Sequence, residues 1–405
     1  MGHSNEYEAL AERFEAFVVD YDEGEGMVVL RGGRAAVFPI VSPPVEEIRI
    51  RKTCYMIAER LLWMVLPGGG VVSAEAGFGL VDQPLMGRPV IYLDQCHWSA
   101  IANAVYGGRI SERVKEAALR ILSLANSGKI VLPLSSAHMI ETSATYAEKR
   151  QNLATVMLGA SRGWIMRDPI DVRQDEALSA LTRRYLSTER EVEPVFCLDH
   201  SRLYAGRSAA WHPEGPHNDL PPLLTEVWIW LTEVSSTYDT LVDPQSIDDR
   251  VHYSKWAVYH QRLSSEFAAK RESSARKRKL GLLAAFSDVH REIAKMAAVA
   301  NLSVEQFRDW VIVHRESDIA RLPFLGLYFD TMALRLSDSS RKWQANDLID
   351  GLYLSCATAY ADAVGGERAA TEYIRRSWRN RDGQAPIFAT LAELVEYVDG
   401  ELLRR

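Results

Sequence analysis

The segment that most constrains the fold is Val90–Leu93, four apolar residues that run directly into Asp94. An apolar run this short is typical of a strand buried on both faces, as in a parallel sheet covered by helices. Such sheets bind ligands at the carboxyl ends of their strands, where the loops open. Asp94 is therefore predicted to lie at a ligand-binding edge. The alternative is that Asp94 caps the helix predicted from about Trp98 onward.

Other short apolar runs support the same sheet. The predicted strands are Ile130–Leu134, Gly163–Met166, Ala363–Val364 and Ile387–Thr390, and helical patterns separate them. Strands that alternate with helices predict βαβ units. The predicted fold class is therefore α/β, with a parallel sheet flanked by helices.

The remaining sequence predicts additions to this sheet domain. Residues 1–87 are predicted to form a small N-terminal α+β region, and residues 186–340 carry long helical patterns that predict a large α-helical insertion. The sheet domain is then expected in two halves, residues 88–185 and 341–405.

Local patterns give more specific expectations. Gly32-Gly33 between two short apolar runs predicts a hairpin turn. Apolar residues at helical spacing predict one helix over Ile48–Leu66 and another that starts after Ser135 or Ser136 and extends to about Leu158. Ser135 and Ser136 are both suitable N-caps for that second helix.

Composition limits the class of protein. A net charge of −7 argues against a wholly basic nucleic-acid coat protein, although it leaves room for a local basic track. The four cysteines form no C-x-x-C pair, which fits a reducing compartment rather than a disulfide scaffold or a thiolate zinc site. We find no signal-peptide pattern and no apolar run long enough to span a membrane. We therefore expect a soluble cytoplasmic protein that makes no contact with a membrane.

Acidic residues occur at four places where a ligand site is expected. They are Asp94 after a strand, Glu141 inside a helix, Asp347 with Asp350 at a helix start, and Glu367 after a short strand. Carboxylates that converge in one cleft repel each other, and a hard divalent cation such as Mg²⁺ or Mn²⁺ removes that repulsion. Capping of a helix N-terminus is the simpler explanation for Asp347.

The order of these motifs resembles that of the PIN-domain nucleases. The resemblance rests on Tyr92-Leu93-Asp94, on the helix with Glu141, on Asp350–Ala357, and on Ala363–Glu367, which places Glu367 17 residues after Asp350. It covers about residues 88–170 and 344–379, under a third of the chain. Each motif alone is unspecific, and their order and spacing carry the resemblance.

This resemblance implies a PIN-like fold and a metal-dependent endoribonuclease that hydrolyses RNA phosphodiester bonds. It implies Asp94, Glu141 and Asp350 as the main catalytic metal ligands, with Glu367 or Asp347 as the fourth. Asp362 is a minor candidate, because it precedes the short strand instead of following it. The implied cofactor is Mg²⁺ or Mn²⁺, and the resemblance also suggests a toxin or a host-defence effector.

Basic side chains are predicted to hold the nucleic-acid backbone, by attraction to its phosphates. The candidates are Lys270, Arg271, Arg276, Lys277, Arg278 and Lys279 in one run, Arg375, Arg376 and Arg379 near the last acid, and His97 beside Asp94. The alternatives are a solvated helix face for the first run and a packed core position for His97.

Two other functions are also compatible with the sequence. The chain could be a catalytically inactive PIN-like scaffold that binds nucleic acid or protein partners through its helical insertion. The expected partners are RNA, with DNA as an alternative, and a protein partner or second copy bound through the insertion. A hydrolase or nucleotide-binding enzyme of another α/β class is disfavoured, because the chain lacks G-x-S-x-G and a convincing G-x-G-x-x-G.

Overall fold

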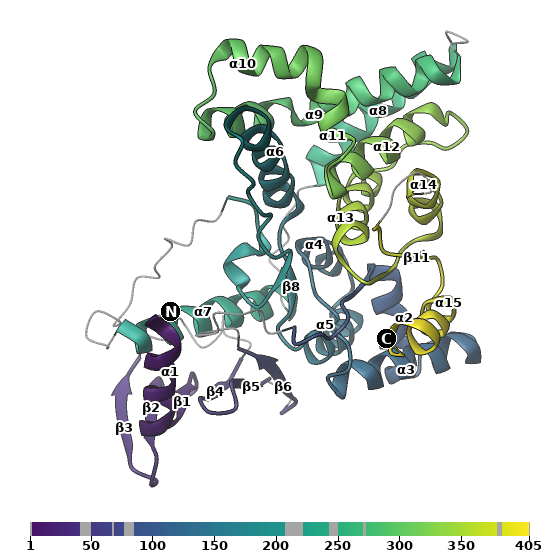
Figure 1. The fold of residues 1–405 in the computed structure, drawn as a ribbon. Helices are drawn as coiled ribbons and strands as arrows, with labels where there is room; N and C mark the ends of the chain where they lie inside the picture. The colour runs from purple at the N-terminus through teal and green to yellow at the C-terminus, as the bar shows by residue number, and fades with distance from the viewer. Residues whose placement is uncertain are drawn as a thin grey trace. The chain divides into compact units, whose positions relative to one another are not determined.

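The computed structural model describes residues 2–40, 50–66, 69–76, 85–206, 222–242, 250–269, 273–378 and 383–404. It shows a mixed α/β protein with an antiparallel sheet, a small parallel sheet and many helices (Figure 1). The chain forms two compact units. One comprises residues 1–90, 98–167 and 196–247, and the other comprises residues 91–97, 168–195 and 248–405.

The first unit contains a six-stranded antiparallel sheet in the order β3-β2-β1-β4-β5-β6. Its strands are β1 (Phe14–Asp20), β2 (Glu25–Leu30), β3 (Ala35–Pro39), β4 (Lys52–Met56), β5 (Leu61–Val65) and β6 (Val71–Glu75), and helix α1 (Gly2–Arg13) precedes them. The hairpin expected around Gly32-Gly33 is confirmed, because β2 pairs with β3. Gly26 allows this pairing, since the Phe38 ring lies where a Cβ at position 26 would be.

The helix expected over Ile48–Leu66 is wrong, because β4 and β5 occupy its described part as an antiparallel hairpin. Residues 41–49 lie outside the described residues. The apolar residues fit a period of 3.6, but Tyr55, Leu62 and Met64 also fit a period of two and are fully buried. The chain reverses between the strands, where Arg60 takes a positive φ of 52°.

The helices of the first unit follow the sheet. They are α2 (Gln95–Tyr106), most of which belongs to this unit, α3 (Glu112–Asn126), α4 (Ser136–Ser143), α5 (Ala147–Ser161) and α7 (Pro222–Val242). The single helix expected from Ser135 or Ser136 to Leu158 is therefore two helices, α4 and α5. Residues 144–146 interrupt it, and Tyr146 is the N-cap of α5.

The second unit contains three parallel strands in the order β11-β10-β7. They are β7 (Ile91–Leu93), β10 (Ala363–Gly365) and β11 (Ile387–Phe388). The expected strands at these three positions are thus confirmed, although each is short. In the first unit, isolated parallel bridges join Val90 to Val131 and Leu134 to Ile165. Ile165 belongs to β8 (Ile165–Met166), which pairs antiparallel with β9 (Phe196–Cys197).

Helix α12 (Pro323–Ser337) is the core of the helical part of the second unit and is buried over most of its length. It packs against α9 (Ser274–Val299), α13 (Asn346–Tyr360), α14 (Arg368–Trp378), α8 (Arg250–Ala269) and α6 (Pro169–Leu186). The shorter elements are α10 (Val304–Asp309), a π-helical turn at Trp310–His314, α11 (Arg315–Ile319), α15 (Leu391–Tyr397) and a second π-helical turn at Val398–Leu402. The long helical patterns between residues 186 and 340 therefore form helices where the structure describes them.

Among the described residues, no helix combines the length and apolar character that a membrane span requires.

Candidate metal centre

Asp94 lies where the sequence predicts, directly after β7. Its N–H donates to the Gly365 carbonyl at 2.8 Å, which continues the pairing of β7 with β10. Its side chain accepts hydrogen bonds from two backbone N–H groups, that of Gln95 at 2.8 Å and that of Glu367 at 3.1 Å. Asp94 therefore joins the carboxyl ends of two adjacent parallel strands.

The environment of Asp94 disfavours its negative charge. Burial is the main cause that raises the pKa of the Asp94 carboxyl above its ordinary value, and the nearby Glu367 carboxylate acts in the same direction. The two backbone hydrogen bonds and the Cys96 thiol, 3.8 Å from Oδ2, oppose this rise without cancelling it. A nearby cation would thus stabilise the ionised form.

Glu141 lies on α4, whose start is fixed by a local capping arrangement. The Ser135 N–H donates to Nδ1 of His138 at 3.0 Å, so a histidine takes the part that Glu or Gln plays in a standard capping box. The ring of His138 also packs edge-on against Trp98, with 6.3 Å between the ring centroids. Trp98 follows Asp94 by four residues, and His138 precedes Glu141 by three, so this contact lies about one helical turn from each acid.

Asp350 lies on α13 and is only 9% exposed. This helix packs against α12, where Met332 and Tyr328 lie beside Gly351. The start of α13 is tied to α12 by an ion pair between Arg335 and Asp347, with 3.0 Å between Nη2 and Oδ2. Asp350 is therefore held by a helix that is anchored one turn earlier.

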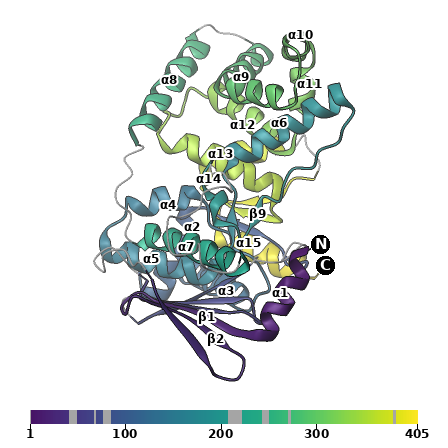
Figure 2. The ribbon, with the colours of Figure 1, turned by 90° about the vertical axis from the view of Figure 1, so that its left-hand side faces the viewer.

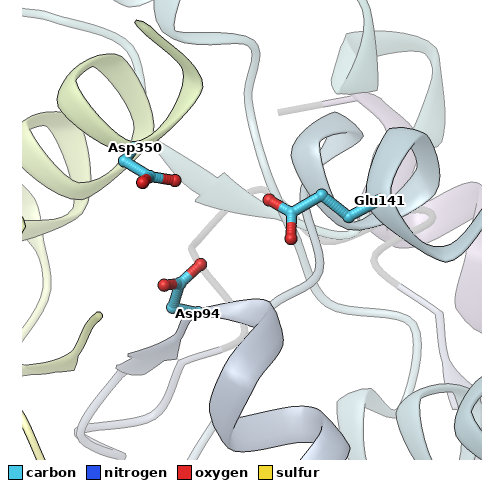
Figure 3. A group of neighbouring side chains, drawn as sticks. All are labelled: Asp94, Glu141 and Asp350. Atoms are coloured by element: carbon cyan, nitrogen blue, oxygen red, sulfur yellow. The ribbon is translucent and has the colours of Figure 1, made fainter. Parts of the chain in front are cut away.

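The structure brings Asp94, Glu141 and Asp350 together. One carboxylate oxygen of each lies within 4.8 Å of the other two, and Figure 3 shows the three side chains pointing toward one another. Two oxygens bound to the same Mg²⁺ ion, each about 2.1 Å from it, lie at most about 4.2 Å apart. Side-chain rotation would therefore have to bring the three oxygens closer together for shared ligation. The three partly buried carboxylates could bind a metal ion, and an all-oxygen donor set suits a hard cation.

The other predicted acids occupy different positions. Both carboxylate oxygens of Asp347 face arginines, Oδ2 toward Arg335 and Oδ1 toward Arg341 at 3.5 Å, so its role in this structure is an ion pair. Glu367 is exposed and lies near Asp94 through its backbone N–H. Asp362 precedes β10 and therefore lies at the opposite end of that strand from Glu367.

His97 is buried, which removes it as a phosphate contact. It is 6% exposed, and burial lowers its pKa to about 4, so the ring is neutral at pH 7. A Cβ at position 365 would lie 2.8 Å from Cδ2 of His97, so the ring requires glycine at the end of β10. The alternative of a packed core residue is the one that the structure supports.

The predicted basic residues are only partly available to a ligand. Arg276, Lys277, Arg278 and Lys279 lie on α9 with mostly exposed side chains, but Arg278 pairs with Asp330 at 2.6 Å. On α14, Arg375 donates to the Ile387 carbonyl at 2.8 Å, whereas Arg376 is exposed. Lys270, Arg271 and Arg379 lie outside the described residues.

The sequence did not indicate the residues that hold the Asp350 helix in place. Glu176 of α6 is fully buried and accepts hydrogen bonds from the N–H groups of Phe324 and Leu325 at the start of α12. It also accepts one from the hydroxyl of Tyr360 at the end of α13. In the sequence Glu176 directly follows Arg173, Gln174 and Asp175, a pattern typical of a solvated helix face, so no signal marked it.

Comparison with known proteins adds no information about function, since no protein-family model, curated protein or solved structure matches the chain.

Proposed function

We propose that this protein is a PIN-like, divalent-metal-dependent ribonuclease. The observation that carries the proposal is the convergence of Asp94, Glu141 and Asp350. The first and the last of these acids are 256 residues apart in the sequence. These are the three acids to which the resemblance gave the main ligand roles. Capping or surface solvation of single acids does not explain why all three share one place.

The surroundings of the β7 strand support the same proposal. The Pro89 carbonyl accepts from the Val131 N–H at 2.9 Å, whereas the Asp94 N–H donates to Gly365. Asp94 thus follows a strand that pairs in parallel with β10, and open parallel sheets bind ligands at the carboxyl ends of their strands.

The acidic and the basic residues would have different roles. Asp94, Glu141 and Asp350 would hold Mg²⁺ or Mn²⁺, and Glu367, whose backbone N–H donates to Asp94, remains the candidate for a fourth ligand. When bound, such an ion supplies an activated water and neutralises charge on the scissile phosphate. Arg276, Lys277, Lys279 and Arg376 remain candidates for contacts with the RNA backbone.

Cleavage of RNA by the purified protein tests the proposal. We expect single-stranded RNA to be cut in the presence of Mn²⁺ or Mg²⁺ and to remain intact with EDTA. Cleavage that persists in EDTA would contradict the metal-dependent scheme. Binding of RNA and Mn²⁺ without cleavage would instead favour the inactive scaffold, and cleavage of DNA alone would change the substrate class.

Metal binding should also raise thermal stability. A ligand at 100 times its dissociation constant adds about 2.7 kcal/mol, which for a chain of this length shifts the unfolding midpoint by about 3 °C. We expect this shift for Mn²⁺ by differential scanning calorimetry at pH 7.5. The Asp94→Asn variant should show no such shift, because the cation loses one of its three charged ligands.

The pH dependence of stability has a definite sign. The pKa of the Asp94 carboxyl is higher in the folded protein than in the unfolded chain, so the protonated side chain favours folding relative to the ionised one. This contribution to the free energy of unfolding is complete below the pKa that Asp94 has in the unfolded chain, and it is lost as the pH rises through the pKa that Asp94 has in the folded protein. Without a divalent ion, Asp94→Asn should therefore be more stable than the natural protein at pH 7.5, and the difference should shrink as the pH falls. Equal midpoints at pH 7.5 would show that Asp94 carries no such cost.

A further inference from the structure

The antiparallel sheet of the first unit has two faces with different surroundings. Phe17, Tyr55, Leu62 and Ala74 point to one face and are fully buried. Helices α5 and α7 cover this face (Figure 2), and the ring of Trp230 on α7 lies 5.4 Å from that of Tyr55. Among the described elements of this unit, no helix covers the opposite face.

The opposite face carries a row of mostly apolar residues across the six strands. The strand pairings align Val37, Met27, Val18, Cys54, Trp63 and Ser73, from β3 through β2, β1, β4 and β5 to β6. Val37 is 55% exposed and Trp63 is 42% exposed, and the other four are partly exposed. Such a row is unusual on a solvated face, where polar residues are expected.

A neighbouring row contains three charged residues, two of which pair with each other within one copy. The pairings align Asp20 with Lys52, and their side chains form an ion pair at 3.1 Å. In the same row, Val65 pairs with Val71, which is 55% exposed. Glu25 of β2 lies in the same row beside Asp20 and is exposed. The face therefore presents apolar side chains together with one further carboxylate.

The size of the face matches a small protein–protein interface. Strands are roughly 4.8 Å apart and rise roughly 3.3 Å per residue, so six strands of five residues cover roughly 500 Å². Two such faces in contact would bury roughly 1,000 Å², which is about the minimum for a specific interface.

We propose that this protein forms a homodimer through the open face of the sheet β3-β2-β1-β4-β5-β6. A second copy is the occupant that fits best, because face-to-face packing requires two sheets of similar twist, and an identical sheet has the same twist. The internal pairing of Asp20 with Lys52 leaves Glu25 as the only other charged residue in these two rows, which limits the repulsion between identical faces. This proposal does not depend on the ribonuclease activity.

Analytical ultracentrifugation of the full chain tests the proposal. We expect a dimer at micromolar concentration. The Trp63→Lys variant should weaken the dimer at least tenfold, because a central tryptophan is a frequent interface hot spot and the change buries two charges in the contact. Met27→Lys provides a second disruption in the same row, in case the first variant fails to fold by circular dichroism.

A matched control separates this face from other apolar surface. Ile312 lies on the π-helical turn Trp310–His314, is 69% exposed, and should tolerate Ile312→Lys with the dimer unchanged. A natural protein that is monomeric up to about 100 μM would overturn the proposal. A dimer that survives Trp63→Lys and Met27→Lys, or that only Ile312→Lys disrupts, would place the interface elsewhere.

Discussion

Replacing Asp94 by asparagine is expected to lower the rate of RNA cleavage by more than about 100-fold, without unfolding the protein. Loss of a hydrogen-bond partner outside the ligand shell already costs about 10- to 100-fold in metal sites, and loss of a ligand should cost more. Asn keeps an oxygen that accepts the Gln95 N–H but removes the charge that the cation requires. Initial rates at saturating Mn²⁺ measure the effect.

The controls for this prediction come from the other acids. Glu141→Gln and Asp350→Asn should lower the rate to a similar extent, because their carboxylates share the site. Asp362→Asn should leave the rate unchanged, since Asp362 lies at the opposite end of β10. An Asp94→Asn variant with the natural rate would mean that the acidic group is not the catalytic centre.

The Arg335→Ala substitution is expected to lower the free energy of unfolding by about 3–5 kcal/mol. The side chains of Arg335 and Asp347 are 5% and 9% exposed, and removal of one partner of a buried ion pair leaves the other charge without compensation. Arg335 also donates to the Arg341 and Lys342 carbonyls and lies over the Trp343 ring. Urea denaturation monitored by circular dichroism measures the change.

An exposed ion pair provides the comparison for Arg335. Arg262 pairs with Glu266 one helical turn away, and its side chain is 81% exposed. Arg262→Ala should therefore cost no more than about 0.5 kcal/mol. A loss below about 1 kcal/mol for Arg335→Ala would show that this pair does not anchor α13.

The sequence predicted the strand that ends at Asp94 because that signal is local. Four apolar residues followed by an acid define both the buried strand and its polar end, and β7 forms there. Glu141 and Asp350 were reached through the order of motifs, since an acid in a helix is ordinary by itself. Asp347 shows the limit of this reasoning, because its partner Arg335 lies 12 residues earlier on another helix.

The sequence predicted only part of the antiparallel sheet. The apolar residues between positions 50 and 66 fit both a helical period and a strand period. Only pairing with neighbouring strands decides between helix and strand here. Cross-strand pairs such as Cys54 with Trp63 provide that decision. The buried His97 was ambiguous for a related reason, since its neighbour Gly365 lies 268 residues away.

Calorimetric titration with Mn²⁺ tests most directly whether the three carboxylates form a cation site. We predict saturable binding to the natural protein, loss of that binding in Asp94→Asn, Glu141→Gln and Asp350→Asn, and unchanged binding in Asp362→Asn. Heats that do not saturate with the natural protein, or binding that survives all three substitutions, would contradict the account.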